Sequence, residues 1–217
     1  MKKRNKTMLL IAVGLIVTFI AWTVLVRSID VQEVGPNSSS VGLAAVNTWF
    51  HSVTGTNMSL YVVTDWLGLV PVGVALAFAI LGLVQLIKRR SFLKVDHSIL
   101  ALGGFYIAVI AAYVIFEYAV INYRPVLIEG YLEASYPSST TLLVLCVMPT
   151  AAMQMKDRIK NKLLGKLLRL AIIAFTAFMV IGRLVSGVHW LSDIVGGILL
   201  SSGLVAMYAW ASELTKA

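Results

Sequence analysis

Residues 98–116 read SILALGGFYIAVIAAYVIF, an apolar run of 19 residues without a charged side chain. An α-helix rises about 1.5 Å per residue, so a run of this length nearly crosses the roughly 30 Å hydrocarbon core of a bilayer. We therefore predict a membrane helix here. Working outward, five more apolar runs occupy residues 8–26, 66–87, 137–155, 170–182 and 194–212. The pattern predicts an all-α integral membrane protein built as a six-transmembrane-helix bundle.

The composition supports the same class. The chain has 217 residues, of which 59% are hydrophobic and 13% charged, and its mean hydropathy is +0.88. Soluble domains are about 45–50% apolar and about 25% charged, so a soluble or disordered protein is excluded. No linker or internal repeat divides the sequence, and we expect a single membrane domain over residues 1–217. The one cysteine, Cys146, cannot form an internal disulfide.

The run at 170–182 is unusually short because Arg169 and Arg183 flank it. Its 13 residues cover about 20 Å, which is too short to span a bilayer. Either this run does not span, or an arginine lies at membrane depth. Arg169 has lysine neighbours and can extend toward the cytoplasm, whereas Arg183 has none, so Arg183 requires an explanation.

The positions of the basic residues predict the orientation. Of the 18 lysines and arginines, only Arg27, Arg124 and Arg183 fall on one side, and the rest lie in the termini and two connections on the other. Basic loops stay in the cytoplasm, so both termini are predicted to be cytoplasmic. The net charge of +8 thus reflects topology, and no nucleic-acid partner is predicted. The first run is too long for a signal peptide and lacks a cleavage site, so we expect an uncleaved anchor.

The segment 27–65 is predicted to lie outside the membrane. Within it, residues 41–52 (VGLAAVNTWFHS) carry Leu43, Val46, Trp49 and Phe50 at helical spacing. This pattern fits a helix lying in the membrane interface. It also fits an apolar loop packed on the bundle, and the sequence does not distinguish the two.

The outer ends of the last four runs carry five ionisable residues, which are costly at membrane depth and usually functional. His189 and Asp193 are four positions apart and share one helical face. The carboxylate there can accept a hydrogen bond from one imidazole nitrogen and leave the other nucleophilic. The pair is equally compatible with a structural contact at a helix end. No second histidine or acidic cluster lies near, so no metal is predicted. The five residues are Glu117, Arg124, Arg183, His189 and Asp193.

Residues 136–141 (YPSSTT) open the fourth run. Proline followed by hydroxyl residues is typical of a helix start, whose free N–H groups attract anions. Guanidinium groups bind phosphate in a bidentate manner. We therefore predict that Arg124, Arg183 and the helix start at Ser138–Thr140 form an oxyanion pocket near His189.

These residues, taken in order, resemble the type 2 phosphatidic acid phosphatase (PAP2) superfamily, whose signature is K-x6-R-P, P-S-G-H and S-R-x5-H-x3-D. The resemblance covers about 116–212 by motif and the whole chain by topology. It implies a PAP2-like fold and a phosphohistidine mechanism without metal or other cofactor. By resemblance, His189 is the nucleophile, Asp193 orients it, and Arg124, Ser138, the N–H of Ser139 and Arg183 bind phosphate.

Ser139 stands where the motif has glycine and keeps its backbone N–H, and three further motif positions depart from that signature. The first-motif lysine is Glu117, the second-motif histidine is Thr140, and the serine before the third-motif arginine is Gly182. In the family, the second-motif histidine protonates the leaving group, and losing such an acid costs about 10²–10⁴ in rate. Three roles for Glu117 stay open: an ion pair with Arg124 or Arg183, a contact with a cationic head group, or replacement of the missing acid.

Two function classes follow. The first is an outward-facing membrane phosphatase acting on a phospholipid or polyprenyl phosphate or diphosphate, with diphosphates preferred because their leaving group needs no proton. The second is a catalytically impaired PAP2-like protein that binds lipid phosphate head groups or acts as a scaffold among membrane lipids. A transporter is disfavoured, since Pro71 and Pro149 interrupt two runs without marking paired halves.

Overall fold

The computed structural model describes residues 2–156 and 158–214. These residues form helices joined by turns and irregular segments, and among them only isolated β-bridges represent extended pairing. The helices, with the short 3-10 turns η1 and η2, are α1 (Lys2–Ser28), η1 (Pro36–Ser38), α2 (Ala44–Thr54), α3 (Met58–Leu67), α4 (Leu69–Arg89), η2 (Phe92–Lys94), α5 (His97–Tyr118), α6 (Ser139–Lys156), α7 (Lys162–Val185) and α8 (Leu191–Leu214).

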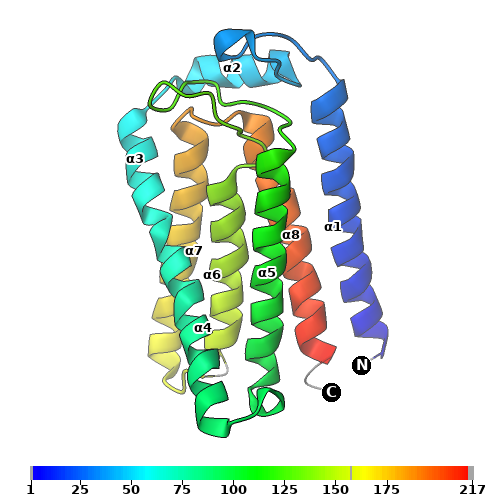
Figure 1. The fold of residues 1–217 in the computed structure, drawn as a ribbon, viewed down its shortest axis with the longest axis vertical. Coiled ribbons are helices and arrows are strands. Elements are labelled where there is room, and N and C mark those ends of the chain that lie inside the picture. Colours follow the sequence, from blue (N-terminus) through cyan, green and yellow to red (C-terminus); the bar gives the residue numbers. More distant parts are fainter. Residues whose placement is uncertain (1, 157, 215–217) are drawn as a thin grey trace.

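The long helices run side by side along one axis, and α2 lies across one end of the bundle (Figure 1). Helix α6 packs against α4, α5, α7 and α8, and α1 packs along α8. The irregular segment between α5 and α6 lies at the end crossed by α2, whereas the N- and C-terminal ends lie at the other. We call the first end the α2 end and the second the terminal end.

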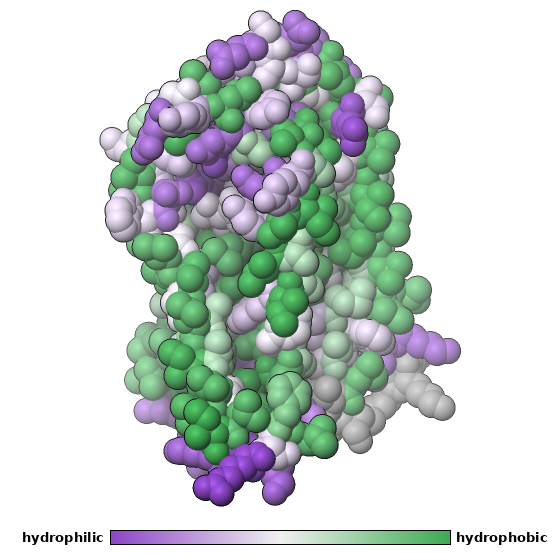
Figure 2. Space-filling view, viewed as in Figure 1, coloured by the Kyte–Doolittle hydropathy of each residue, from purple (hydrophilic) through white to green (hydrophobic). Residues whose placement is uncertain are grey.

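The surface agrees with a membrane protein. Apolar side chains cover the middle of the face shown in Figure 2, and hydrophilic ones gather toward both ends. Within the described residues, five stretches are long and apolar enough to cross a bilayer. Helix α6, the fourth predicted span, has 18 residues and lies among the other helices. The prediction of an all-α membrane bundle is confirmed. The five stretches are Asn5–Ser28, Met58–Arg89, His97–Tyr118, Lys162–Val185 and Leu191–Leu214.

The second span begins earlier than its apolar run suggested. It starts at Met58 and turns at Gly68, where α3 passes into α4. Pro71 lies in the first turn of α4, where a missing N–H is harmless because first-turn N–H groups have no partner within the helix. If α3 and α4 formed one continuous helix, Pro71 would lie in its interior and disrupt it. Asp65 therefore lies inside a membrane stretch rather than in an outer loop.

The fifth span is longer than its apolar run. Helix α7 has 24 residues and continues past both flanking arginines, so its length matches a bilayer. Arg183 lies within it and is only 2% exposed. Of the two alternatives for this segment, the buried arginine is the one the fold adopts.

The helix predicted within residues 41–52 is present as α2 (Ala44–Thr54). It packs on α8, where Asn47 accepts a hydrogen bond from the N–H of Ser192 at 3.1 Å and donates one to the Ser192 hydroxyl at 2.9 Å. Trp49 on the opposite side is 63% exposed. The alternative of an irregular loop is wrong, because buried amide contacts fix this segment as a helix.

Candidate active site

His189 lies in the turn between α7 and α8 at the α2 end. Gly187 adopts a φ of +67°, and a Cβ there would meet the Gly55 carbonyl oxygen at 1.8 Å. Only glycine fits such a turn pressed against another backbone. The Asn57 N–H also donates to the Ser186 carbonyl at 2.8 Å. The turn is thereby docked on the α2–α3 connection, and His189 is 3% exposed.

Asp193 lies beside His189 but does not form the predicted hydrogen bond with it. The His189 Nδ1 and Asp193 Oδ2 atoms are 3.7 Å apart, which exceeds hydrogen-bond distance. Asp193 Oδ2 instead accepts from the Trp190 N–H at 2.9 Å, and Oδ1 accepts from Asn122 at 3.3 Å. The carboxylate is fully buried and is held by these two partners while it faces Nδ1.

The other imidazole nitrogen faces Arg124. The Arg124 Nη1 and His189 Nε2 atoms are 3.3 Å apart. Arginine only donates, so Nε2 accepts and the ring proton resides on Nδ1, on the Asp193 side. Burial lowers the pKa of His189 well below its usual range, and the charges of Arg124 and Arg183 lower it further. The imidazole is therefore neutral, with its lone pair directed toward the arginines.

Arg183 projects from α7 into the same region. Its Nη2 donates to Asp65 Oδ1 at 2.7 Å and to the Thr140 hydroxyl. The guanidinium carbons of Arg183 and Arg124 lie 4.9 and 5.8 Å from the centre of the Tyr61 ring. Arg183 Nε and Nη1 are buried without a hydrogen-bond partner. The two arginines thus converge over one aromatic ring, with donors unused.

The start of α6 completes the region. The helix begins at Ser139 rather than Pro137, since the Ser138 carbonyl accepts the first helical hydrogen bond, from Leu142 at 2.9 Å. The Ser138 N–H donates to the Asp193 carbonyl at 3.1 Å, and its buried hydroxyl has no partner. Ser139 is half-buried and lines a cavity of about 450 Å³ with Arg124. The predicted convergence of arginines, helix start and histidine is observed.

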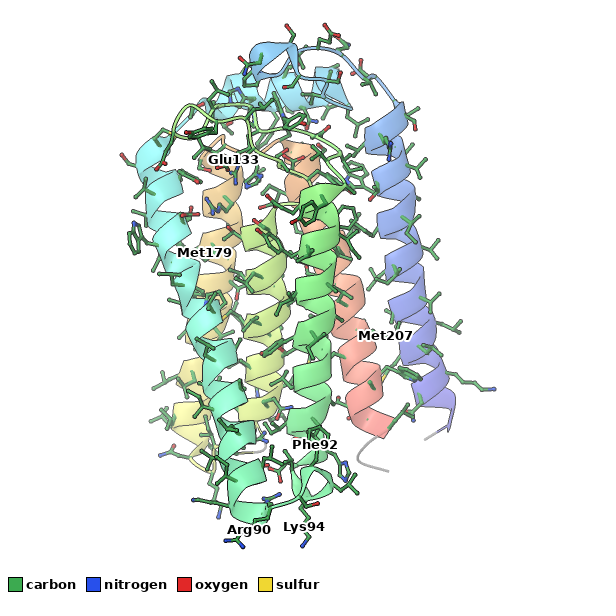
Figure 3. All side chains as sticks on the ribbon, in the orientation of Figure 1. Arg90, Phe92, Lys94, Glu133, Met179 and Met207 are labelled. Carbon is green, nitrogen blue, oxygen red and sulfur yellow. The ribbon has the colours of Figure 1, made fainter. Side chains whose placement is uncertain are left out.

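Glu117 does not pair with either arginine, so that reading of it is wrong. Arg124 Nε lies 2.9 Å from Glu133 Oε2, and Arg183 pairs with Asp65. Glu117 is exposed and lines the same 450 Å³ cavity as Arg124 and Glu133. Figure 3 labels Glu133 at the α2 end, far from Arg90 and Lys94 at the terminal end. Each arginine is thus paired with another carboxylate, and Glu117 faces the cavity without an ion pair to either of them.

Gly182, where the PAP2 motif has serine, is buried against α3. A Cβ there would meet Thr64 Cγ2 at 2.7 Å, closer than two carbon atoms can approach. Glycine at 182 therefore allows α3 to pack tightly on α7. The same contact brings Asp65, the next residue after Thr64, onto Arg183.

Sequence reasoning missed several residues of this region. The sequence places Asp65 in the outer segment, because the second apolar run begins at Trp66. The signal for it was available, since Met58–Leu67 has helical composition and a lone acid. Tyr61, Asn122 and Glu133 carry no pattern of their own. Only the fold brings Tyr61 and Glu133 to the arginines and Asn122 to Asp193.

The region has the parts needed to bind a tetrahedral oxyanion: two guanidinium groups, a helix start and a neutral imidazole. Among the described residues, no group of three or more histidine, cysteine or acidic side chains is arranged to hold a metal ion. The chemistry open to these residues is nucleophilic attack by Nε2 on a bound phosphoryl group.

Comparisons with known proteins agree with this fold. Residues 117–216 match the family model of the PAP2 superfamily. The fold matches the crystal structure of a transmembrane PAP2-type phosphatidylglycerolphosphate phosphatase from Bacillus subtilis, with a TM-score of 0.54 and 18% sequence identity, over 94% of this chain and 96% of that one. No curated protein matches the sequence. The resemblance to the PAP2 superfamily is confirmed, and this membrane protein carries a PAP2 superfamily segment at residues 117–216.

Proposed function

We propose that this protein is a membrane lipid phosphatase that hydrolyses a phospholipid or polyprenyl phosphate or diphosphate through a phosphohistidine at His189. The observation that carries the proposal is the convergence of Arg124, buried Arg183 and neutral His189 at one end of the bundle. Burying a guanidinium with two unpartnered nitrogens is costly unless an anion completes its bonding. The fold match to a phosphatidylglycerolphosphate phosphatase supports a lipid phosphate as the ligand class.

In the first step, the phosphate oxygens bind Arg124, Arg183, the Ser138 hydroxyl and the first-turn N–H groups of α6. Binding draws Arg124 away from His189 Nε2. The Nε2 lone pair attacks phosphorus, the bond to the leaving oxygen breaks, and that oxygen keeps the electron pair. The ring then carries a positive charge that buried Asp193 stabilises from the Nδ1 side.

We further propose that diphosphates are preferred over monophosphates. A monophosphate ester expels an alkoxide, which needs a proton in the transition state, and Thr140 cannot supply one near neutral pH. A diphosphate expels a phosphate monoester, whose second pKa is about 6, so it leaves unprotonated. The absence of an acid at Thr140 therefore slows the first reaction far more than the second.

The orientation is part of the proposal. The site lies at the α2 end, opposite the termini and opposite the basic α4–α5 connection that carries Arg90 and Lys94. Basic segments remain in the cytoplasm, so we place both termini inside and the site on the outer face of the cytoplasmic membrane.

The second candidate is a protein that binds lipid phosphate without turnover. Two observations favour it: Thr140 replaces the family's acid, and both arginines are paired with carboxylates. Such a protein would hold phosphate head groups weakly, since an anion has to compete with the Asp65 and Glu133 carboxylates for the two guanidinium groups.

Phosphate release from a panel of lipid monophosphates and diphosphates separates the two candidates. We expect purified protein in detergent to release phosphate, fastest from a polyprenyl diphosphate, and His189→Ala to abolish release. Phosphate binding with no release from any substrate would favour the binding protein. Equal activity in His189→Ala would exclude the phosphohistidine mechanism.

A further inference from the structure

A phosphohistidine enzyme has to complete a second step, in which water attacks the phosphorus on His189. The attacking water must lose a proton to a base. His189 cannot serve, because its Nε2 carries the phosphoryl group. The Thr140 hydroxyl is no base near neutral pH either. A turnover therefore requires another basic side chain near the arginine clamp.

Asp65 has the position for this role. Its Oδ1 accepts a hydrogen bond from Arg183 Nη2 at 2.7 Å, and the same nitrogen donates to the Thr140 hydroxyl. The Asp65 carboxylate and the Thr140 hydroxyl are therefore both hydrogen-bonded to one guanidinium nitrogen. Thr140 occupies the motif position at which the PAP2 signature has its proton-transferring histidine.

Asp65 is also accessible to water, although it pairs with the buried guanidinium of Arg183. Its side chain is 57% exposed, whereas that of Arg183 is 2% exposed. Only Oδ1 has a hydrogen-bond partner among the described residues, which leaves Oδ2 available to a water molecule.

The other carboxylates are less suitable. Asp193 is fully buried and faces His189 Nδ1, on the side of the ring away from the phosphoryl group. Glu117 contacts neither arginine. Glu133 is 41% exposed and pairs with Arg124 Nε, whereas the Thr140 hydroxyl is bonded to Arg183. Glu133 is thus a matched control: a half-exposed carboxylate on the other arginine.

We propose that Asp65 is the general base that hydrolyses the phosphohistidine, an inference that rests on the proposed function. The water oxygen forms a bond to phosphorus as the P–Nε2 bond breaks, and the bonding electron pair returns to Nε2. The water proton passes to Asp65 Oδ2 and then to solvent. The products are inorganic phosphate and neutral His189. No acid is needed in the first step when the substrate is a diphosphate.

The test separates the two steps with a polyprenyl diphosphate radiolabelled in its terminal phosphate, in detergent, by rapid quenching. For Asp65→Asn we expect one rapid equivalent of lipid product and a steady-state rate about 10²–10⁴ lower. An acid-labile, alkali-stable phosphoenzyme should accumulate toward one per protein. In wild type and Glu133→Gln it should stay scarce. Thr140→His added to Asp65→Asn should restore steady turnover, because the new imidazole can accept the proton of the attacking water in place of Asp65.

Each result decides a different claim. Wild type that neither turns over nor forms a phosphoenzyme would overturn the proposed function and, with it, this inference. Active wild type with unchanged Asp65→Asn would overturn the role of Asp65 alone. A slow steady-state rate for Asp65→Asn without accumulation of phosphoenzyme would also overturn that role, since Asp65 would then act in binding or in the first step. Accumulation of phosphoenzyme in Glu133→Gln and not in Asp65→Asn would identify Glu133 as the base and overturn the role of Asp65.

Discussion

Replacing Gly182 with serine, the residue that the PAP2 motif has there, should damage this protein. Any Cβ at 182 meets Thr64 Cγ2 at 2.7 Å, and Thr64 is fully buried with its hydroxyl bonded to the carbonyls of Leu60 and Tyr61 at 2.9 Å. Thr64 therefore cannot rotate away without losing those bonds. The contact can be relieved only by moving α3 from α7.

Overpacking of this kind costs about 1–3 kcal/mol in free energy of unfolding. For a chain of this size, each 1 kcal/mol corresponds to roughly 2–4 °C in Tm. Gly182→Ser should thus lower the thermal midpoint in detergent by roughly 2–12 °C. Phosphate binding should weaken as well, because the displaced helix carries Tyr61 and Asp65.

Thermal unfolding of five proteins in one detergent tests this reasoning: wild type, Gly182→Ser, Thr64→Ala, the double variant and a control. Thr64→Ala removes the opposing methyl group, so Gly182→Ser should cost less in that background, with a coupling of about 1–2 kcal/mol. Gly73→Ser is the matched control, since nothing lies within 4 Å of a Cβ at 73. An unchanged midpoint for Gly182→Ser, or equal losses with and without Thr64, would refute the tight α3–α7 contact.

Three further predictions concern chemistry, pH and topology. Thr140→His should raise turnover of lipid monophosphates more than that of diphosphates, measured as phosphate release, and equal gains would mean that another group already protonates the leaving oxygen. The pKa of His189 is lowered in the folded protein, so the unfolded state binds more protons and stability should fall as the pH drops below about 6.5. His189→Gln should show a smaller loss of Tm between pH 7.5 and 5.5 than wild type, and an equal loss would contradict burial of a neutral ring. Cysteines introduced at Asn37 and Glu129 should react with a membrane-impermeant thiol reagent in intact cells while one at Lys160 should not, and the reverse pattern would place the site in the cytoplasm.

The motif residues could be proposed from sequence because their order and spacing resemble those of the PAP2 superfamily. His189 lies in the turn just before α8 and Asp193 lies in the first turn of α8, so their spacing of four residues brings them side by side. The cost of a charge at membrane depth singles out Arg183 without knowledge of its partner. The order of Arg124, Ser138 and His189 then indicated one pocket. The ends of the helices were harder to predict. Arg169 and Arg183 bound the apolar run, but α7 continues past both of them.

The partners of the arginines could not be derived in this way. Asp65 is distant from Arg183 in sequence and Glu133 lies in an irregular segment, so their contacts depend on how α3 and the α5–α6 connection pack. An ion pair of Glu117 with Arg124 or Arg183 is one of the roles that the sequence leaves open, because Glu117 occupies the first-motif position. Similarly, Gly182 read as a lost serine, whereas the packing of Thr64 makes glycine the residue that fits.

The central claim is that Arg124, Arg183 and Ser138 form an oxyanion pocket facing His189 Nε2. An experimental structure with bound vanadate tests it most directly. We expect vanadium within covalent distance of Nε2, its oxygens bonded to both guanidinium groups and to the Ser138 hydroxyl, and Arg124 moved off the imidazole. Vanadate bound elsewhere, or a vanadate-soaked site in which Arg124 still caps Nε2 and both arginines keep only their carboxylate partners, would contradict it.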